Sequence, residues 1–387
     1  MKSQRAWMMT LSTIVALMAA ASTANGQFPS LHPVPGFHPA AHPSATMVDQ
    51  QSYDPTWIGN ANYGDTCCGP NWYDFSIDAV YMKRDNAGRN VPLSSDGIAG
   101  VEPPNVVLST ADLDFDYEPG LQASARYQLS AVYNIEAGYL GVVDWGAHAS
   151  VTSENDSLYS FFSQFGNQPF GGFADVDQAS FHSVNYRTHL DTVELNMRRS
   201  WILPSYRLHG SWLTGFRWLK LRDEMDFFAQ VAPHFDPINE VDRDAAFTDY
   251  RLQIDNNLYG SQLGGQLGVC ILPGLLVTGD IKAGAYYLQS TLDSQLTSTS
   301  LPTARLDFGD SDDIALLAQA GAYVTYQLHP LWKIRAGYQF LYLDGIALAP
   351  SNISRQQPFT GGTRLVAIND NGDALFHGGV LGLEIGW

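Results

Sequence analysis

From Trp72 to the C-terminal Trp387, apolar and polar residues alternate along one segment after another. Successive side chains of a β-strand point to opposite faces, so this period of two predicts strands with one apolar and one polar face. Ten such segments can be delimited in the sequence. They cover residues 72–83, 121–129, 133–145, 190–199, 206–221, about 259–271, 275–289, 314–328, 332–343 and 376–387.

The connections between these segments alternate in length. Short ones lie near residues 130, 204, 273 and 330, and long ones cover about 84–118, 146–187, 223–248, 290–310 and 346–373. A β-sandwich has no reason to keep this rhythm, whereas an outer-membrane barrel has short turns on one side and long loops on the other. We therefore predict an all-β fold, a transmembrane up-and-down antiparallel β-barrel of about ten strands, or up to twelve if Leu113–Tyr117 and Leu252–Ile254 form strands of their own. A soluble protein with amphipathic strands is the alternative.

The composition suits a barrel and argues against other classes. Charged residues make up 16% of the chain, aromatic residues make up 12%, and the net charge is -18. A nucleic acid requires a basic surface, so we expect no nucleic-acid partner, and electrostatic attachment to anionic lipid is disfavoured for the same reason. Beyond the N-terminal region no apolar run reaches the roughly 18 residues that a membrane-spanning helix needs.

The residues before the strands divide into two parts. Lys2 and Arg5 precede an apolar run from Trp7 to Ala21 and a group of small residues, which predicts a signal peptide over residues 1–26. Residues 27–70 are rich in Pro and His and predict a disordered periplasmic linker. Residues 71–387 then form the predicted barrel. Export by this signal predicts a location in the bacterial outer membrane.

Aromatic residues gather towards the ends of the predicted strands, as the interfacial girdles of a membrane barrel require. They are Tyr73, Tyr81, Trp212, Trp218, Trp332 and Trp387. The last segment, FHGGVLGLEIGW, ends on Trp387 and is expected to close the barrel by pairing with the first, since an open edge is not tolerated in lipid. A terminal aromatic of this kind resembles the signal that the barrel-assembly machinery reads on the closing strand of outer-membrane barrels.

Four phrases in order resemble one family. They are LTGFRWLKLRDE (213–224), LYGSQLGGQLG (258–268), IRAGYQFLYLDGIALAP (334–350) and FHGGVLGLEIGW (376–387), and CCGPNWY (67–73) is similar to the entry into its barrel. The family is the planctomycete-type outer-membrane β-barrel porins, number seven among the β-barrel porin families. The resemblance covers about residues 67–387 and implies an outer-membrane barrel classed as a porin. It implies neither a particular solute nor a catalytic residue.

The polar face of the predicted strands supplies the candidate site. Its pore-lining candidates are Arg126, Glu136, Glu194, Arg198, Arg207, Arg217, Gln262, Gln266, Asp280, Lys282, Gln319, Gln327, Arg335, Gln339 and Glu384. In one reading these groups line a passive, porin-like channel that selects small hydrophilic solutes or ions by charge. In the other they pair into a salt-bridged plug, since a barrel of about eight strands is nearly filled by its own side chains. The plugged protein would be a structural or adhesive barrel that acts through its long outer loops.

Enzymatic chemistry has little support in the sequence. No G-x-S-x-G elbow, H-E-x-x-H or P-loop occurs, and the only loop constellations are His234 with Asp236 and Asp242 with Asp244. An outer-membrane hydrolase built on these residues is a third possibility, but we expect no enzyme and no cofactor. Three cysteines, Cys67, Cys68 and Cys270, leave disulfide bonding and unpaired thiols open, and we expect no metal. The expected partners are outer-membrane lipid and the assembly machinery.

Overall fold

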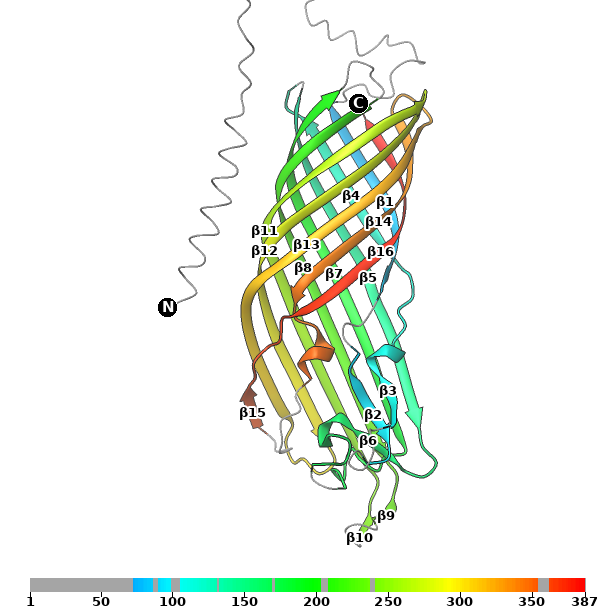
Figure 1. Cartoon of the computed structure of the whole chain (residues 1–387), viewed down its shortest axis with the longest axis vertical. Helices are drawn as coiled ribbons and strands as arrows, with labels where there is room; N and C mark the ends of the chain where they lie inside the picture. Colours follow the sequence, from blue (N-terminus) through cyan, green and yellow to red (C-terminus); the bar gives the residue numbers. More distant parts are fainter. Residues whose placement is uncertain are drawn as a thin grey trace, which may run out of the picture. The chain divides into compact units, whose positions relative to one another are not determined.

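Ten strands close into one antiparallel barrel in the computed structural model (Figure 1), which describes residues 72–85, 90–98, 105–130, 132–168, 171–202, 208–236, 241–353 and 362–386. The barrel strands are β1 (Tyr73–Arg84), β4 (Glu118–Gln128), β5 (Tyr133–Thr152), β7 (Phe181–Ile202), β8 (Leu208–Val231), β11 (Ala246–Leu272), β12 (Leu275–Ser298), β13 (Arg305–Gln327), β14 (Trp332–Ile346) and β16 (Gly372–Gly386). Each pairs with the barrel strands before and after it, and β16 pairs with β1, which confirms the predicted up-and-down topology.

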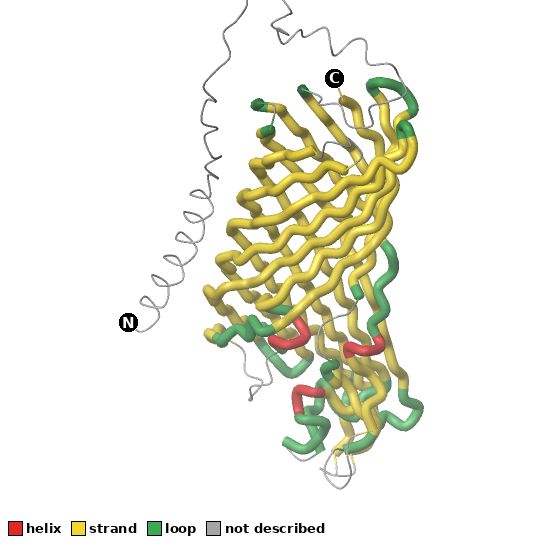
Figure 2. Tube along the Cα trace, turned by 45° about the horizontal axis from the view of Figure 1, so that its top comes forward, coloured by secondary structure: helices red, strands yellow, loops and turns green. Residues whose placement is uncertain are grey.

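The two ends of the barrel differ. At one end, the short-turn end, tight connections such as the one from Leu272 to Leu275 join neighbouring strands. At the other, the loop end, strands β5, β7, β8, β11, β12 and β13 run on past their neighbours and form a curved wall (Figure 2). The loops predicted at 146–187, 223–248 and 290–310 are therefore too long, because strands occupy much of each range. Leu252–Ile254 belongs to β11, and Leu113–Tyr117 is not a strand, so neither adds to the barrel.

Apolar residues change face along the long strands, which explains why their extensions were missed. In β8, Trp212 and Phe216 point outward and are exposed, whereas Met225 and Phe227 point inward and are fully buried. The same change occurs in β11, from exposed Leu263 to buried Leu252. An alternating pattern persists through each strand, but the apolar residues move from the outer to the inner face. We call the six extensions beyond this change the extended wall.

Small elements fill and cover the loop end. Strands β2 (Pro92–Asp96), β3 (Asn105–Ser109) and β6 (Leu158–Ser160) form a separate three-stranded sheet, and β9 (His234–Asp236) and β10 (Val241–Arg243) form a hairpin. The remaining elements are the 3₁₀ helices η2 (Thr110–Asp112), η3 (Phe161–Ser163) and η4 (Ala349–Asn352) and strand β15 (Gly362–Leu365), which pairs in parallel with β13. No helix in the described part of the chain is long and apolar enough to cross a membrane.

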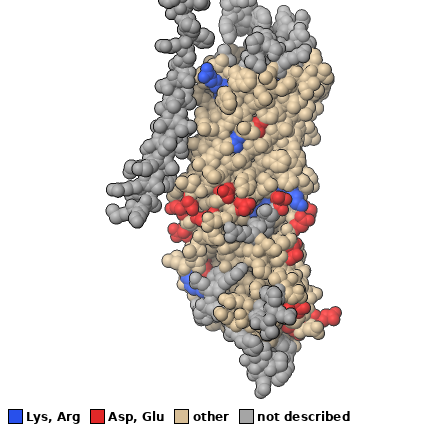
Figure 3. Space-filling view, viewed as in Figure 1, with Lys and Arg blue, Asp and Glu red and all other residues tan. Residues whose placement is uncertain are grey.

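On the face of the barrel shown in Figure 3, a broad zone between the short-turn end and the extended wall carries few charged side chains, and a band of acidic and basic groups borders it. We call these surfaces the apolar band and the charged belt. The apolar band includes Ile77, Leu195, Phe216, Ile281, Leu316, Val324 and Leu381, all of them exposed. Charged residues of the belt occupy facing positions on neighbouring strands. Asp191 of β7 lies opposite Lys220 of β8, and Asp344 of β14 lies opposite Asp373 of β16.

Candidate functional site in the barrel lumen

The lumen near the short-turn end holds a polar layer built on two buried glutamates. Glu136 of β5 accepts hydrogen bonds from Arg198 Nη2 at 2.7 Å and Arg126 Nη2 at 2.8 Å. These arginines lie on the flanking strands, at register positions beside the glutamate: Arg126 opposite Glu136 itself and Arg198 opposite Asn134. Two cations on neighbouring strands thus compensate one buried carboxylate, as burial of a charge requires.

Glu194 of β7 forms the second centre of the polar layer. Arg217 Nη2 donates to its Oε2 at 2.5 Å, Gln262 Nε2 donates to the same oxygen at 2.8 Å, and Lys282 Nζ contacts its Oε1. The donors come from β8, β11 and β12, so this cluster ties together strands that are several positions apart around the barrel. Arg217 Nη2 also reaches Gln319 Oε1 of β13 at 2.7 Å, which carries the network across the lumen.

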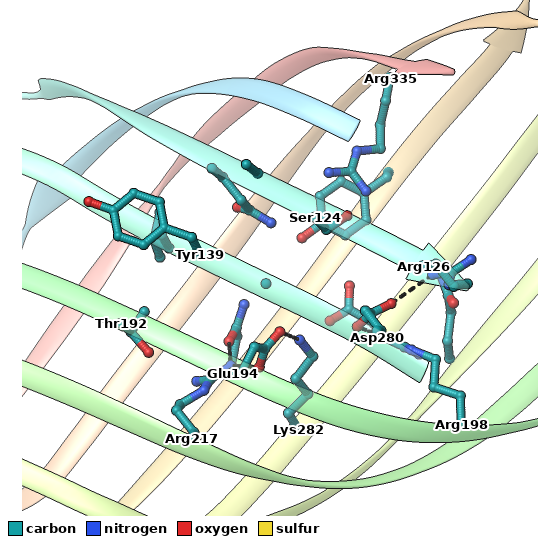
Figure 4. A pocket seen from close by; sticks show the side chains of 18 residues that line it. Ser124, Arg126, Tyr139, Thr192, Glu194, Arg198, Arg217, Asp280, Lys282 and Arg335 are labelled. Carbon is teal, nitrogen blue, oxygen red and sulfur yellow. Dashed lines mark hydrogen bonds and ion pairs between the residues drawn. The ribbon is translucent and has the colours of Figure 1, made fainter. Parts of the chain in front are cut away.

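Two further ion pairs join β14 to β1 and β16. Arg335 Nε donates to Asp78 Oδ1 at 3.1 Å, and Lys333 Nζ donates to Glu384 Oε1 at 2.7 Å. Between the clusters lies a cavity of about 70 Å³ (Figure 4). A single water needs on the order of 10 to 15 Å³ of such space, so the cavity has room for about five waters or slightly more.

Fourteen of the fifteen predicted pore-lining residues lie on described strands. Those that line the cavity are Arg126, Glu136, Glu194, Arg198, Arg217, Gln266, Asp280, Lys282, Gln319 and Arg335. Gln262 and Gln339 are buried beside it, and Gln327 and Glu384 line a smaller cavity at the short-turn end. Arg207, and Trp387 as the expected assembly signal, lie outside the described residues.

A layer of buried apolar side chains fills the lumen next to the polar layer, on the side of the loop end. Its members are Val80, Met82, Leu140, Leu190, Leu219, Leu258, Leu288, Leu317, Leu341, Leu343, Phe376 and Val380, each at most 6% exposed. This apolar layer was not predicted from the sequence, because only polar residues were assigned to the inner face. The available signal was a loss of alternation: in FLYL (340–343) both faces of β14 are apolar.

A buried ionic cluster crosses the lumen beyond the apolar layer. Arg84 Nη1 of β1 donates to Asp223 Oδ1 of β8 at 2.9 Å, and Thr188 Oγ1 of β7 donates to the same oxygen at 2.8 Å. Tyr186 Oη donates to Asp223 Oδ2 at 2.5 Å. Both charged side chains are completely buried. Three barrel strands separate β1 from β8, so this cluster joins distant parts of the barrel wall across the lumen.

The space inside the extended wall is an aromatic core supplied by wall and loops. Phe161 and Phe162 of η3 pack on Phe227 and Tyr250, with ring centroids 5.1 Å apart for Phe161 and Phe227 and 5.2 Å apart for Phe162 and Tyr250. Each of these four rings is at most 1% exposed. The loop that carries η3 therefore folds into the space inside the extended wall. Its aromatic rings form a further packed layer there.

Hydrogen bonds of polar side chains hold this loop against the extended wall. His182 of β7 donates from Nε2 to the Val176 carbonyl at 2.9 Å and contacts Ser94 Oγ through Nδ1 at 2.6 Å. Asp177 accepts from the Ser160 and Phe173 amides at 2.5 and 2.8 Å. Burial lowers the pKa of His182 to about 4 and raises the pKa of Asp177 to about 6, although the hydrogen bonds to Asp177 act in the opposite direction.

The other sequence candidates lie in and next to the hairpin β9–β10 and among the cysteines. In the backbone register of the hairpin, Arg243 lies opposite His234 and Val241 lies opposite Asp236. Cys270 is disulfide-bonded, and the chain's other cysteines, Cys67 and Cys68, lie outside the described residues. Within the described ranges, no group of three or more His, Cys, Asp or Glu side chains is arranged to hold a metal ion.

No protein-family model and no curated protein matches the chain. Solved outer-membrane barrels resemble it. The protease OmpT from Escherichia coli is 9% identical with a TM-score of 0.45, and the match covers 81% of this chain and 96% of that one. The toluene transporter TodX from P. putida is 9% identical with a TM-score of 0.29, covering 82% and 91%. OprG from Pseudomonas aeruginosa is 9% identical with a TM-score of 0.23, covering 82% and 98%. These likenesses transfer no activity to this chain.

Proposed function

We propose that this protein is an outer-membrane β-barrel with a closed lumen, which acts through the folded surface at its loop end and not as an open diffusion pore. The apolar layer is the observation that carries the proposal. A water-filled passage needs polar groups along its whole length, whereas here the polar layer is followed by side chains such as Leu219, Leu317 and Leu341, none more than 2% exposed.

The exterior supports insertion in a membrane. Exposed apolar residues surround the barrel between the short-turn end and the charged belt, and such a surface is stable in lipid but not in water. On β7 the outward residues Val193, Leu195 and Met197 lie between Asp191 of the belt and the end of the strand at Ile202. This length agrees with the roughly nine to eleven residues that a tilted strand needs to cross.

The loop end supports a role at the cell surface. Beyond the charged belt, β8 continues from Leu221 to Val231 and β11 from Ala246 to Asn256. These extensions of about ten residues each correspond to roughly 30 Å of strand. The extended wall is filled by a packed core and stands outside the membrane, so it presents a rigid surface for structural or adhesive contacts.

A narrower family assignment rests on sequence phrases. We place the chain with the planctomycete-type β-barrel porins because of the four phrases that resemble that family, which fall largely on the barrel strands β8, β11, β14 and β16. Targeting to the outer membrane through the expected signal peptide over residues 1–26 belongs to the same proposal.

A porin-like channel is the second candidate, and the polar cavity favours it. Its lining of charged groups near the short-turn end would suit ions or small solutes. Conduction would then require the apolar layer and the Arg84–Asp223 cluster to move aside. Because both are fully buried and ordered by packing, the closed state is the more stable one.

Planar-bilayer recording distinguishes the two functions. The wild-type protein is expected to give no discrete conductance steps in several independent preparations. Triple substitution of Leu219, Leu317 and Leu341 by Ser changes only the apolar layer, so it should also give no steps, because the Arg84–Asp223 cluster and the aromatic core around Phe161 still close the lumen. The control is the outward-facing Leu316→Ser, which changes the neighbouring residue on β13 but not the lumen. Regular steps from the wild-type protein would refute the closed lumen and favour the channel.

A further inference from the structure

Three phenylalanine side chains lie near one another on the outer face of the extended wall, close to its tip. Phe181 of β7 and Phe247 of β11 flank Gln230 of β8 in the strand register, and Phe228 of β8 lies one row nearer the charged belt. Phe247 is 53% exposed, and the ring centroids of Phe181 and Phe228 are 6.3 Å apart. We call these three rings the phenylalanine patch. Because they lie beyond the charged belt and on the face opposite the packed core, neither lipid nor the core accounts for them.

Hydrogen-bonding side chains surround the phenylalanine patch. Three rows of facing residues run across the wall through Gln230, Phe228 and Asp226, and most of their other members carry hydroxyl or amide groups. Among them are Thr152, Ser150, Asn185, Gln295 and Thr297. A stable protein interface has a contiguous apolar core, whereas here Gln230 separates Phe181 from Phe247. The composition therefore favours a partner that is itself rich in hydroxyl groups over a protein partner.

The charged groups in these three rows compensate one another. Arg251 Nη2 lies 3.4 Å from Asp249 Oδ2, and Arg251 Nε lies 3.9 Å from Asp226 Oδ1. Within the described strands the three rows hold no lysine and no second arginine. An anionic partner would therefore meet two carboxylates and a single arginine that already contacts both of them. This balance of charge suits an uncharged partner.

We propose that the phenylalanine patch binds an extended, uncharged polysaccharide whose sugar rings stack on Phe181 and Phe247. The carbon-bound hydrogens of a pyranose form an apolar face that packs on an aromatic ring, while its hydroxyl groups exchange hydrogen bonds with side-chain hydroxyls and amides. Phe181 and Phe247 are two strands apart, which corresponds to about 10 Å. Successive rings of an extended sugar chain are spaced about as widely as neighbouring strands. Alternate rings of one chain therefore reach both phenylalanines, with Gln230 beside the ring between them.

This binding role rests on the proposed function, because the patch meets the outside medium only where the charged belt marks the membrane boundary. An uncharged glycan would then be the partner in the adhesive contacts of the loop end.

Affinity electrophoresis measures the interaction. Native gels are cast with one of three uncharged polysaccharides, hydroxyethyl cellulose, dextran or glycol chitin. The full-length protein is kept in an amine-oxide detergent, because a detergent with a sugar head group would compete for the patch. The wild-type protein should be retarded by at least one of the three. Carboxymethyl cellulose, which has the backbone of hydroxyethyl cellulose but carries negative charge, should retard it less.

Phe247 offers a matched set of variants. Phe247→Leu keeps an apolar side chain but removes the ring, so the dissociation constant obtained from the retardation should rise about tenfold, a common effect of losing an interface aromatic. Phe247→Tyr keeps the ring and should bind as the wild type does. The control is Phe308→Leu, since Phe308 is an exposed phenylalanine on the outer face of the wall but lies on β13, outside the patch.

Two results would overturn the polysaccharide site: a wild-type protein that none of the three polysaccharides retards, or a Phe247→Leu variant that is retarded as strongly as the wild type. Association of two copies through the patch is the competing outcome. Light scattering would then give twice the chain mass for the wild type but not for Phe247→Leu, with no retardation of either, and this too would overturn the site.

The outcome can be told apart from a failure of the proposed function, because no bilayer is involved. Silent bilayers together with unretarded protein would remove the polysaccharide site alone. Conductance steps together with retarded protein would remove the closed lumen alone.

Discussion

His182 and Asp177 place two titrating groups with opposite pH dependence in one buried loop contact. His182 stays neutral in the folded protein down to about pH 4, compared with 6.5 when it is free, so its contribution to stability is complete above pH 6.5 and is lost as the pH falls towards 4. Asp177 keeps its proton up to about pH 6, compared with 3.8 when free, so its contribution is complete below pH 3.8 and is lost as the pH rises to 6. The two effects oppose each other over nearly the same interval.

We therefore expect the wild-type loop to have almost constant stability between pH 4 and 6.5, the interval set by these two pKa values. Asp177→Asn removes one of the opposing groups, so the variant should lose stability on acidification, on the order of 3 kcal/mol for a pKa shift of this size. His182→Gln should instead be more stable at the acid end than at neutral pH. Urea unfolding followed by near-ultraviolet circular dichroism at a series of pH values measures both. A free energy of unfolding that does not change with pH in either variant would contradict the shifted pKa values of His182 and Asp177.

Closure of the barrel depends on how closely β16 approaches β1. The two strands pair over eleven residue positions, from Asp74 with Gly386 to Arg84 with Phe376. A Cβ atom on Gly378 would lie 2.1 Å from the Tyr81 carbonyl oxygen, and one on Gly382 would lie 2.4 Å from the Ile77 carbonyl oxygen. Both clashes are with backbone atoms that cannot move without separating the strands. Gly378 and Gly382 are thus required at the inner face of this pair.

Gly378 and Gly379 provide a matched comparison for this pair of strands. Gly378→Val should weaken closure by roughly 1 to 3 kcal/mol, the usual cost of overpacking. Gly379→Val should have little effect, because nothing lies within 4 Å of a Cβ atom at that position. The readout is the temperature at which the folded band on an unheated gel converts to the unfolded one. Equal transition temperatures for the two variants would show that close approach at Gly378 is not required.

The two ends of the barrel differ, since one has short turns and the other carries the extended wall, and in the proposed outer-membrane setting this difference gives the protein a direction across the membrane. In outer-membrane barrels the short turns face the periplasm, so the hairpin β9–β10 should lie outside the cell. The charged belt would then mark the outer boundary of the membrane.

Cysteine labelling in intact cells checks this direction. Asp242→Cys, in the hairpin, should react with a membrane-impermeant maleimide, and Leu331→Cys, in the exposed turn between β13 and β14, should react only after the cells are lysed. The parent protein provides the background from its own cysteines. Labelling of the Leu331 variant in intact cells would reverse the proposed orientation.

Local sequence is sufficient to predict the strands, their order and the pairing of the last with the first. Alternation is a property of neighbouring residues, so a segment such as Trp332–Leu343 can be recognised wherever it lies in the fold. The inner face of the polar layer could be predicted for the same reason, because Arg126, Glu194 and Lys282 stand opposite exposed apolar residues on their own strands.

Only the tertiary structure decided which side chains meet inside the lumen and that a layer of buried apolar side chains lies across it. The pairing of Glu194 with Lys282 depends on the register of all the strands between β7 and β12, which no single segment contains. The apolar layer and the extended wall could not be predicted from the sequence, because lipid and a packed interior both favour apolar side chains. An apolar residue therefore does not show by itself which of the two it faces. The residues Phe340 and Leu341 are chemically alike, and it is the closed ring of strands that turns the first towards lipid and the second into the core.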